Sequence, residues 1–119
     1  DTTISTTPVR AVTIDELSER FGMPDVLFID VEGFECRALL GAVRTLKKRP
    51  DCFVEVHAGC GLEAAGGSVP GVFEHFPSHD CRFLAWTEQD NAPRPALHAE
   101  DCLAGRFFLV AMPRSRGNP

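Results

Sequence analysis

The chain has 119 residues, of which 44% are hydrophobic and 24% are charged, and its formal net charge at pH 7 is -5. This length and composition are typical of one ordinary globular domain. The acidic balance argues against general binding to DNA or RNA, which requires a basic surface. No apolar run approaches the length of a membrane span, and the N-terminus lacks the apolar region of a signal peptide. We therefore expect a cytoplasmic protein with neither a nucleic-acid partner nor a membrane partner.

The five cysteines are an odd number at irregular spacings, and no CxxC pair occurs. The spacing of a zinc site or a redox dithiol is therefore absent. We expect buried free thiols at all five positions, which are Cys36, Cys52, Cys60, Cys81 and Cys102.

The N-terminal part predicts a flexible lead-in followed by one helix. Residues 1–8 are polar, and residues 9–12 could be the end of a strand. Thr13 and Glu16 have the spacing of a capping box, which favours a helix starting at that point. Gly22 is expected to end this helix.

The central part predicts a strand, a helix and a second strand in close succession. Residues 26–31 (VLFIDV) are almost entirely apolar and suggest a strand buried on both faces. Residues 34–48 have apolar side chains at helical spacing, and residues 52–57 (CFVEVH) suggest another strand. Tight connections of this kind indicate a right-handed βαβ unit with parallel strands.

Beyond this unit the sequence pattern is weaker. Residues 58–70 are rich in glycine and alanine and predict a loop. The remaining expected elements are a short helix over 72–76, strands over 82–87 and 106–112, a helical turn around Leu103, and a flexible tail over 113–119.

Acidic side chains and one histidine occur at the ends of the two central strands. Asp30 and Glu32 end the first strand, and Glu55 and His57 end the second. In a parallel pair these ends meet at one edge of the sheet, where open α/β sheets bind ligands. Asp30 follows an apolar run, where an unpaired charge is costly, so it requires a partner, a ligand or solvent. The four side chains together indicate a site, but they do not define its reaction.

Each of these groups taken alone has a structural explanation. A single acid at a strand end is more often a helix cap or an ion-pair partner than a catalytic group. Glu35 is the strongest example, because it lies in the first turn of the predicted helix. A single histidine is likewise more often structural than a base.

Several motifs give the chain a resemblance to a known family. The segment VLFIDVEGFE is similar to the hydrophobic-IDVEG-x-E motif of FkbM-type methyltransferases, and TIDEL resembles the family's TLDDL element. LLGA, VEVH and the closing FFLVAMP also match in order and spacing. The resemblance covers residues 9–112 and rests on segments 13–17, 26–35, 39–42, 54–57 and 107–113.

The resemblance implies an α/β protein with a Rossmann-like class I methyltransferase fold. Residues 9–112 would be its C-terminal half, a mostly parallel sheet with flanking helices and an antiparallel last strand. The implied cofactor is S-adenosylmethionine, and the implied reaction is methylation of a hydroxyl group on a small molecule, glycan or polyketide. Asp30 and His57 would be catalytic, Glu32 and Glu55 would bind the acceptor, and Asp30, Val31 and Glu32 would lie beside the cofactor.

The family's glycine-rich cofactor turn is not found in the sequence. Gly59, Gly61, Gly66 and Gly67 follow a different strand and do not form a strand-turn-helix fingerprint. We therefore expect the chain to be inactive alone. Either an N-terminal half of a longer protein or a second copy of the chain would complete the sheet at its open edge.

Three other functions remain open from the residues. The acids could hold magnesium in a hydrolase or phosphotransfer enzyme, although the spacing typical of metal ligands is absent and we predict no metal. The chain could also be a non-catalytic α/β interaction module that binds a partner through its sheet edge. A third reading is an assembly domain whose function lies in a separate N-terminal region.

Overall fold

The computed structural model describes residues 4–96, 98–99 and 105–114. The expected lead-in over 1–8, the tail over 113–119 and the turn around Leu103 fall wholly or partly outside these ranges. The described elements, in chain order, are α1 (Ile14–Phe21), β1 (Val26–Ile29), α2 (Glu35–Leu40), α3 (Val43–Lys47), β2 (Asp51–Val56), α4 (Val69–Phe73), β3 (Cys81–Trp86), β4 (Arg94–Ala96) and β5 (Phe107–Pro113).

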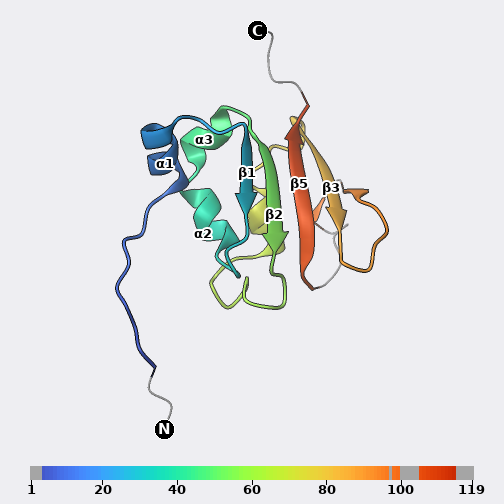
Figure 1. The fold of residues 1–119 in the computed structure, drawn as a ribbon. Helices are drawn as coiled ribbons and strands as arrows, with labels where there is room; N and C mark the ends of the chain where they lie inside the picture. The colour runs from blue at the N-terminus through green and yellow to red at the C-terminus, as the bar shows by residue number, and fades with distance from the viewer. Residues whose placement is uncertain (1–3, 97, 100–104, 115–119) are drawn as a thin grey trace.

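The strands form one mixed sheet in the order β1-β2-β5-β3-β4 (Figure 1). β1 and β2 are parallel, which confirms the predicted βαβ unit. β5 lies between β2 and β3 and is antiparallel to both, and β4 is antiparallel to β3. The expectation of a mostly parallel sheet is therefore wrong for the described residues, while the expected antiparallel last strand is confirmed by β5.

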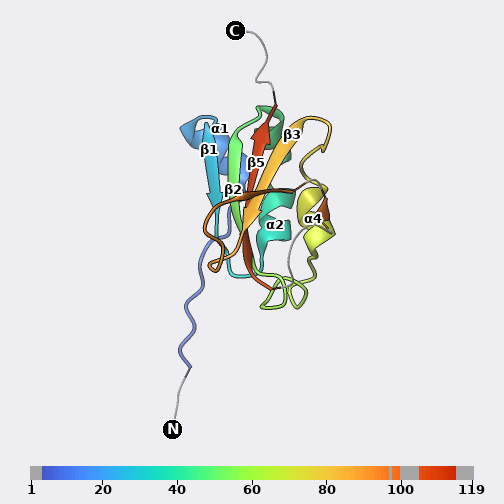
Figure 2. The ribbon, with the colours of Figure 1, turned by 90° about the vertical axis from the view of Figure 1, so that its right-hand side faces the viewer.

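The helices cover one face of the sheet. Figure 2 shows α2 and α4 on the same side of the strands, and α1 packs beside α3 beyond β1 (Figure 1). On the helical side, Cys52, Val54 and Val56 of β2 are buried. On the other side no described helix covers the strands, and the stacked rings of Phe28 and Phe53 are exposed to solvent.

The first strand was predicted to be buried on both faces, and this is wrong for the described structure. Phe28 is 71% exposed and Val26 is 52% exposed, while Ile29 is buried against the helices. β1 pairs only with β2 among the described strands, so it forms an edge of the sheet. The predicted open apolar edge is thus confirmed, and this edge is available for pairing with a further strand.

The predicted helix over 34–48 is divided into α2 and α3 at Gly41 and Ala42. The division follows from the docking of α1. The Gly41 carbonyl accepts a hydrogen bond from the Asp15 amide at 2.8 Å, and the Asp15 carboxylate accepts bonds from the amides of Arg44 and Thr45. Asp15 therefore caps the start of α3, which a continuous helix would not allow.

Other local predictions have mixed outcomes. The Thr13–Glu16 capping box of α1 is confirmed in both of its hydrogen bonds. Residues 9–12 form no strand, and β4 was not predicted. β4 has only three residues, with a proline at position 95, so the sequence pattern does not predict a strand there. The four cysteines within the described residues are free, as expected, but the expected burial is wrong for Cys60, which is exposed, and for Cys36, which is only partly buried. Cys102 lies outside the described residues. None of the described helices is long and apolar enough to span a membrane.

Gly33, in the turn that leaves β1, gives a test of this packing. Its φ of +105° disfavours any side chain, and a Cβ at this position would lie 2.7 Å from the Gly61 backbone. Gly33→Ala should therefore lower the free energy of unfolding by more than about 2 kcal/mol, measured by urea titration.

Gly22→Ala is the matched control. Gly22 has a φ of +101° but nothing within 4 Å of the added Cβ, so its cost should be strain alone, about 1 kcal/mol. Equal losses for the two variants would show that the contact between Gly33 and Gly61 does not constrain the turn.

Candidate active site

The site lies where β1 and β2 end. After β1 the chain turns at Glu32 and Gly33, whose φ angles are +54° and +105°. The Phe34 amide closes this turn on the Val31 carbonyl at 3.2 Å. A left-handed conformation at a residue other than glycine is uncommon and costs roughly 1 kcal/mol or more, so the surrounding structure must impose it.

Glu35 and His57 form a buried pair behind this turn. The Glu35 carboxylate and the His57 Nδ1 share a hydrogen bond, and the two side chains are 0% and 4% exposed. The same oxygen, Oε1 of Glu35, accepts a bond from the Gly33 amide at 3.1 Å. Glu35 was interpreted as a helix-terminus acid. It does begin α2, but its side chain holds both the turn after β1 and the imidazole after β2.

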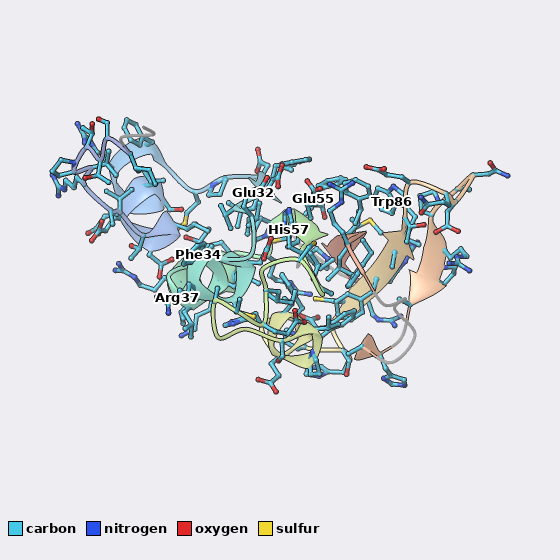
Figure 3. All side chains as sticks on the ribbon, turned by 90° about the horizontal axis from the view of Figure 1, so that it is seen from below. Glu32, Phe34, Arg37, Glu55, His57 and Trp86 are labelled. Atoms are coloured by element: carbon cyan, nitrogen blue, oxygen red, sulfur yellow. The ribbon has the colours of Figure 1, made fainter. Side chains whose placement is uncertain are left out.

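The opposite nitrogen of His57 faces three carboxylates. Its Nε2 lies 3.7 Å from Asp30 Oδ1, 3.8 Å from Glu32 Oε2 and 4.0 Å from Glu55 Oε1. Figure 3 shows the labelled side chains of Glu32, Glu55 and His57 together at this end of the sheet. All four polar residues that were predicted as site residues are therefore neighbours. Val31, expected beside the cofactor, lies in the same turn and is 38% exposed.

Arg106 approaches the cluster from the side of β5. Its Nη1 lies 3.3 Å from Glu55 Oε1, and its Nη2 pairs with Glu88. The pKa of Glu55 is raised by burial, by a hydrogen bond to Asp30 and by the charge of Asp30, although Arg106 and His57 act in the opposite direction. The charge of Asp30 at close range thus favours the protonated form of Glu55.

The environment of His57 favours its protonated form. Burial alone would lower the pKa, but the hydrogen bond to Glu35 and the charges of Glu35, Glu32 and Glu55 raise it above its ordinary value. Because Nδ1 is bound to Glu35, Nε2 is the atom that can exchange a proton or bind a ligand.

Asp30, Glu55 and His57 also have the geometry of metal ligands. One ligand atom from each lies within 4.8 Å of the other two. The three residues come from two strand ends and are brought together by the pairing of β1 with β2, so their spacing along the sequence is not that of a metal-binding motif. Imidazole and carboxylate groups are suitable ligands for divalent metals.

Two participants in the site are not predicted by the sequence pattern. Arg106 precedes β5, and it reaches Glu55 because Phe108, two residues later, pairs with Glu55 in the sheet. Only knowledge of the strand order could have found it. Glu35 was visible as an acid next to the motif, but its pairing with His57 depends on how α2 packs against β2.

The Glu35–His57 pair predicts a pH-dependent stability. A histidine with a raised pKa in the folded state contributes stability below its unfolded pKa of about 6.5, and this contribution is lost as the pH rises through the folded pKa. Glu35→Gln should lower the pKa of His57, so the variant should lose more stability near about pH 6 than near about pH 9. The measurements are the NMR titration of the His57 ring and urea unfolding at both pH values.

Glu63→Gln is the matched control, because Glu63 also accepts a backbone hydrogen bond, from Gly59, but lies on the exposed loop after β2. It should leave the His57 titration unchanged. If Glu35→Gln also left it unchanged, the buried pair would not set the protonation state of His57.

Comparison with known proteins identifies the family. The family model of the Methyltransferase FkbM domain matches residues 1–81, which is more than half of the chain. The match includes both strand ends of the site and stops at the start of β3, so it does not test the resemblance of FFLVAMP to the family's closing strand. The searches of curated proteins and of solved structures find no match. The match to the family model supports a methyltransferase function, and the chain belongs to the FkbM methyltransferase domain family.

Proposed function

We propose that the chain is the acceptor-side part of an S-adenosylmethionine-dependent methyltransferase that methylates a hydroxyl oxygen. The observation that carries this proposal is the cluster of Asp30, Glu32, Glu55 and His57 within the region matched by the family model. The acceptor class that we propose is a small molecule, a glycan or a polyketide.

The cluster fits one end of the cofactor. Carboxylates that outnumber the nearby cations suit a sulfonium, whose positive charge they stabilise at short range. The adenosine end has no corresponding element among the described residues, because neither β1 nor β2 leads into a glycine-rich turn at a helix start of the dinucleotide-binding type. The open edge of β1 can accept a strand that carries such a turn, from upstream residues of a longer protein or from a second chain.

The cofactor would supply a methyl group that is transferred to the hydroxyl oxygen while its bond to sulfur breaks and the electron pair remains on the neutral thioether. The residues of this chain position the hydroxyl and take its proton. His57 Nε2 is suited to accept that proton when it is neutral, because Glu35 fixes the ring through Nδ1. Asp30 and Glu55 can accept hydrogen bonds from the hydroxyl and hold it in line. Since displacement at a methyl group depends strongly on alignment, positioning should contribute more than proton transfer.

The test is calorimetric titration of S-adenosylhomocysteine, the demethylated product, into this chain and into the chain extended by its native upstream residues. We expect binding by the extended protein and none by the 119-residue chain. In the extended protein, Asp30→Ala should weaken binding by about tenfold, since roughly 1.4 kcal/mol of interaction is lost.

The matched control is Asp25→Ala, which removes the same charge at the opposite end of β1. It should bind like the unchanged protein. Absence of binding by both forms of the protein would overturn the proposed cofactor, and binding by the short chain would show that the open edge of β1 is not needed.

A further inference from the structure

We propose that Asp30, Glu55 and His57 bind one divalent transition-metal ion. Their ligand atoms lie within 4.8 Å of one another, and His57 Nε2 is 3.7 Å from Asp30 and 4.0 Å from Glu55. Two ligands that each bind a metal at about 2.1 Å are about 3–4 Å apart. Shifts of well under about 1 Å would therefore bring the three atoms onto one ion.

The burial of His57 is the observation that separates this cluster from an ordinary group of surface acids. The side chain is 4% exposed, and its Nε2 faces the carboxylates of Asp30, Glu32 and Glu55 at 3.7, 3.8 and 4.0 Å, which is longer than an ordinary hydrogen bond. Nδ1 on the other side is held by the buried Glu35. When a histidine binds a metal through one ring nitrogen, a carboxylate commonly fixes the other nitrogen in this way.

The local charge also favours a cation. Four carboxylates, from Asp30, Glu32, Glu35 and Glu55, surround one imidazole, and the Arg106 guanidinium lies beside Glu55 alone among them. Negative charge is in excess even with His57 protonated, and the excess grows when Nε2 loses its proton, as it must to bind a metal. Within the cluster Arg106 pairs with Glu55, and its other contact is with Glu88, outside the cluster. A dication at Nε2 would offset the remaining charge at short range.

The ligand set and its exposure indicate the type of ion. One imidazole nitrogen with two carboxylate oxygens suits manganese, iron or zinc better than calcium or magnesium, which prefer oxygen ligands alone. Asp30 and Glu32 are 42% and 86% exposed, so the cluster opens to solvent on that side. Three protein ligands with an open side are typical of a metal that binds substrate.

The chemical consequence rests on the proposed methyl transfer. A bound ion would coordinate the acceptor hydroxyl, lower the pKa of that hydroxyl and hold its oxygen in place. His57 Nε2 would then be a ligand and could not act as the base at the same time, so the proton would leave to solvent or to Glu32. The metal site itself does not depend on the cofactor.

The test is titration of the 119-residue chain with Mn²⁺ alone. Binding is measured as the loss of the electron paramagnetic resonance signal of free Mn²⁺. We expect one ion per chain, and Asp30→Asn or Glu55→Gln should weaken binding by about 10–100-fold. Asp25→Asn at the other end of β1 is the matched control and should bind normally. Circular dichroism of each variant checks folding, and the exposure of Asp30 makes its variant the safer one.

Proton NMR locates the ion. Paramagnetic Mn²⁺ at substoichiometric amounts should broaden the ring signals of His57 before those of His75 and His79. The proposal would be overturned by any of three results. These are no binding up to about 1 mM Mn²⁺, equal effects of Asp30→Asn and Asp25→Asn on Mn²⁺ affinity, and broadening of the His75 or His79 signals before those of His57. None of these measurements uses S-adenosylhomocysteine. The proposed metal site and the proposed function are therefore tested independently of each other.

Discussion

The buried hydrogen bond between Glu35 and His57 connects the parts of the structure on which the site depends. Glu35 begins α2, and the same carboxylate oxygen binds the amide of Gly33 in the turn after β1. His57 directly follows β2, so one carboxylate joins a helix, a turn and a strand end. Its second oxygen, Oε2, is buried without a hydrogen-bond partner among the described residues, so Oε1 must offset most of the cost of burying this charge. A neutral residue of similar size could fill the space, but it could not orient the imidazole and favour its charged form at the same time.

The open side of the sheet is the second constraint. β1 has a free edge, and the face that carries Phe28 and Phe53 has no helix over it among the described residues. A parallel strand such as β1 is normally covered on both faces and paired on both edges. The acid cluster lies at the end of this same uncovered strand, beside Glu55 on the neighbouring strand. The position of the site at a boundary of the described sheet therefore agrees with a function in which a further element contributes to the ligand pocket.

The structural features that depend on neighbouring residues were predicted from the sequence. The features that are determined by contacts between distant residues were not. The capping box at Thr13 and the parallel βαβ unit follow from local spacing and apolar runs, and both are present. The division between α2 and α3 could not be seen, because it is caused by Asp15, which lies 29 residues before Arg44. The antiparallel majority of the sheet was missed because the position of β5 between β2 and β3 has no local signature. The site residues on the strand ends were predictable from strand polarity, whereas Arg106 required the register of β5.

Five of the seven positions of the motif IDVEGFE have a physical explanation in the structure. Ile29 faces the helices and is 4% exposed, so its neighbour Asp30 must face the open side, where it meets the imidazole. Glu32 adopts a left-handed conformation, which turns the chain sharply and places its carboxylate 3.8 Å from His57. Gly33 is required because the backbone of Gly61 lies where a Cβ would be. Glu35 then returns to the interior as the partner of His57. Two acids of the motif thus face the imidazole of His57, and the third holds that imidazole from its other side. A structural cap would require only one of them, since a single carboxylate satisfies the amides of one turn. The additional charge is costly in the folded protein alone, and a bound cation or a sulfonium would offset that cost.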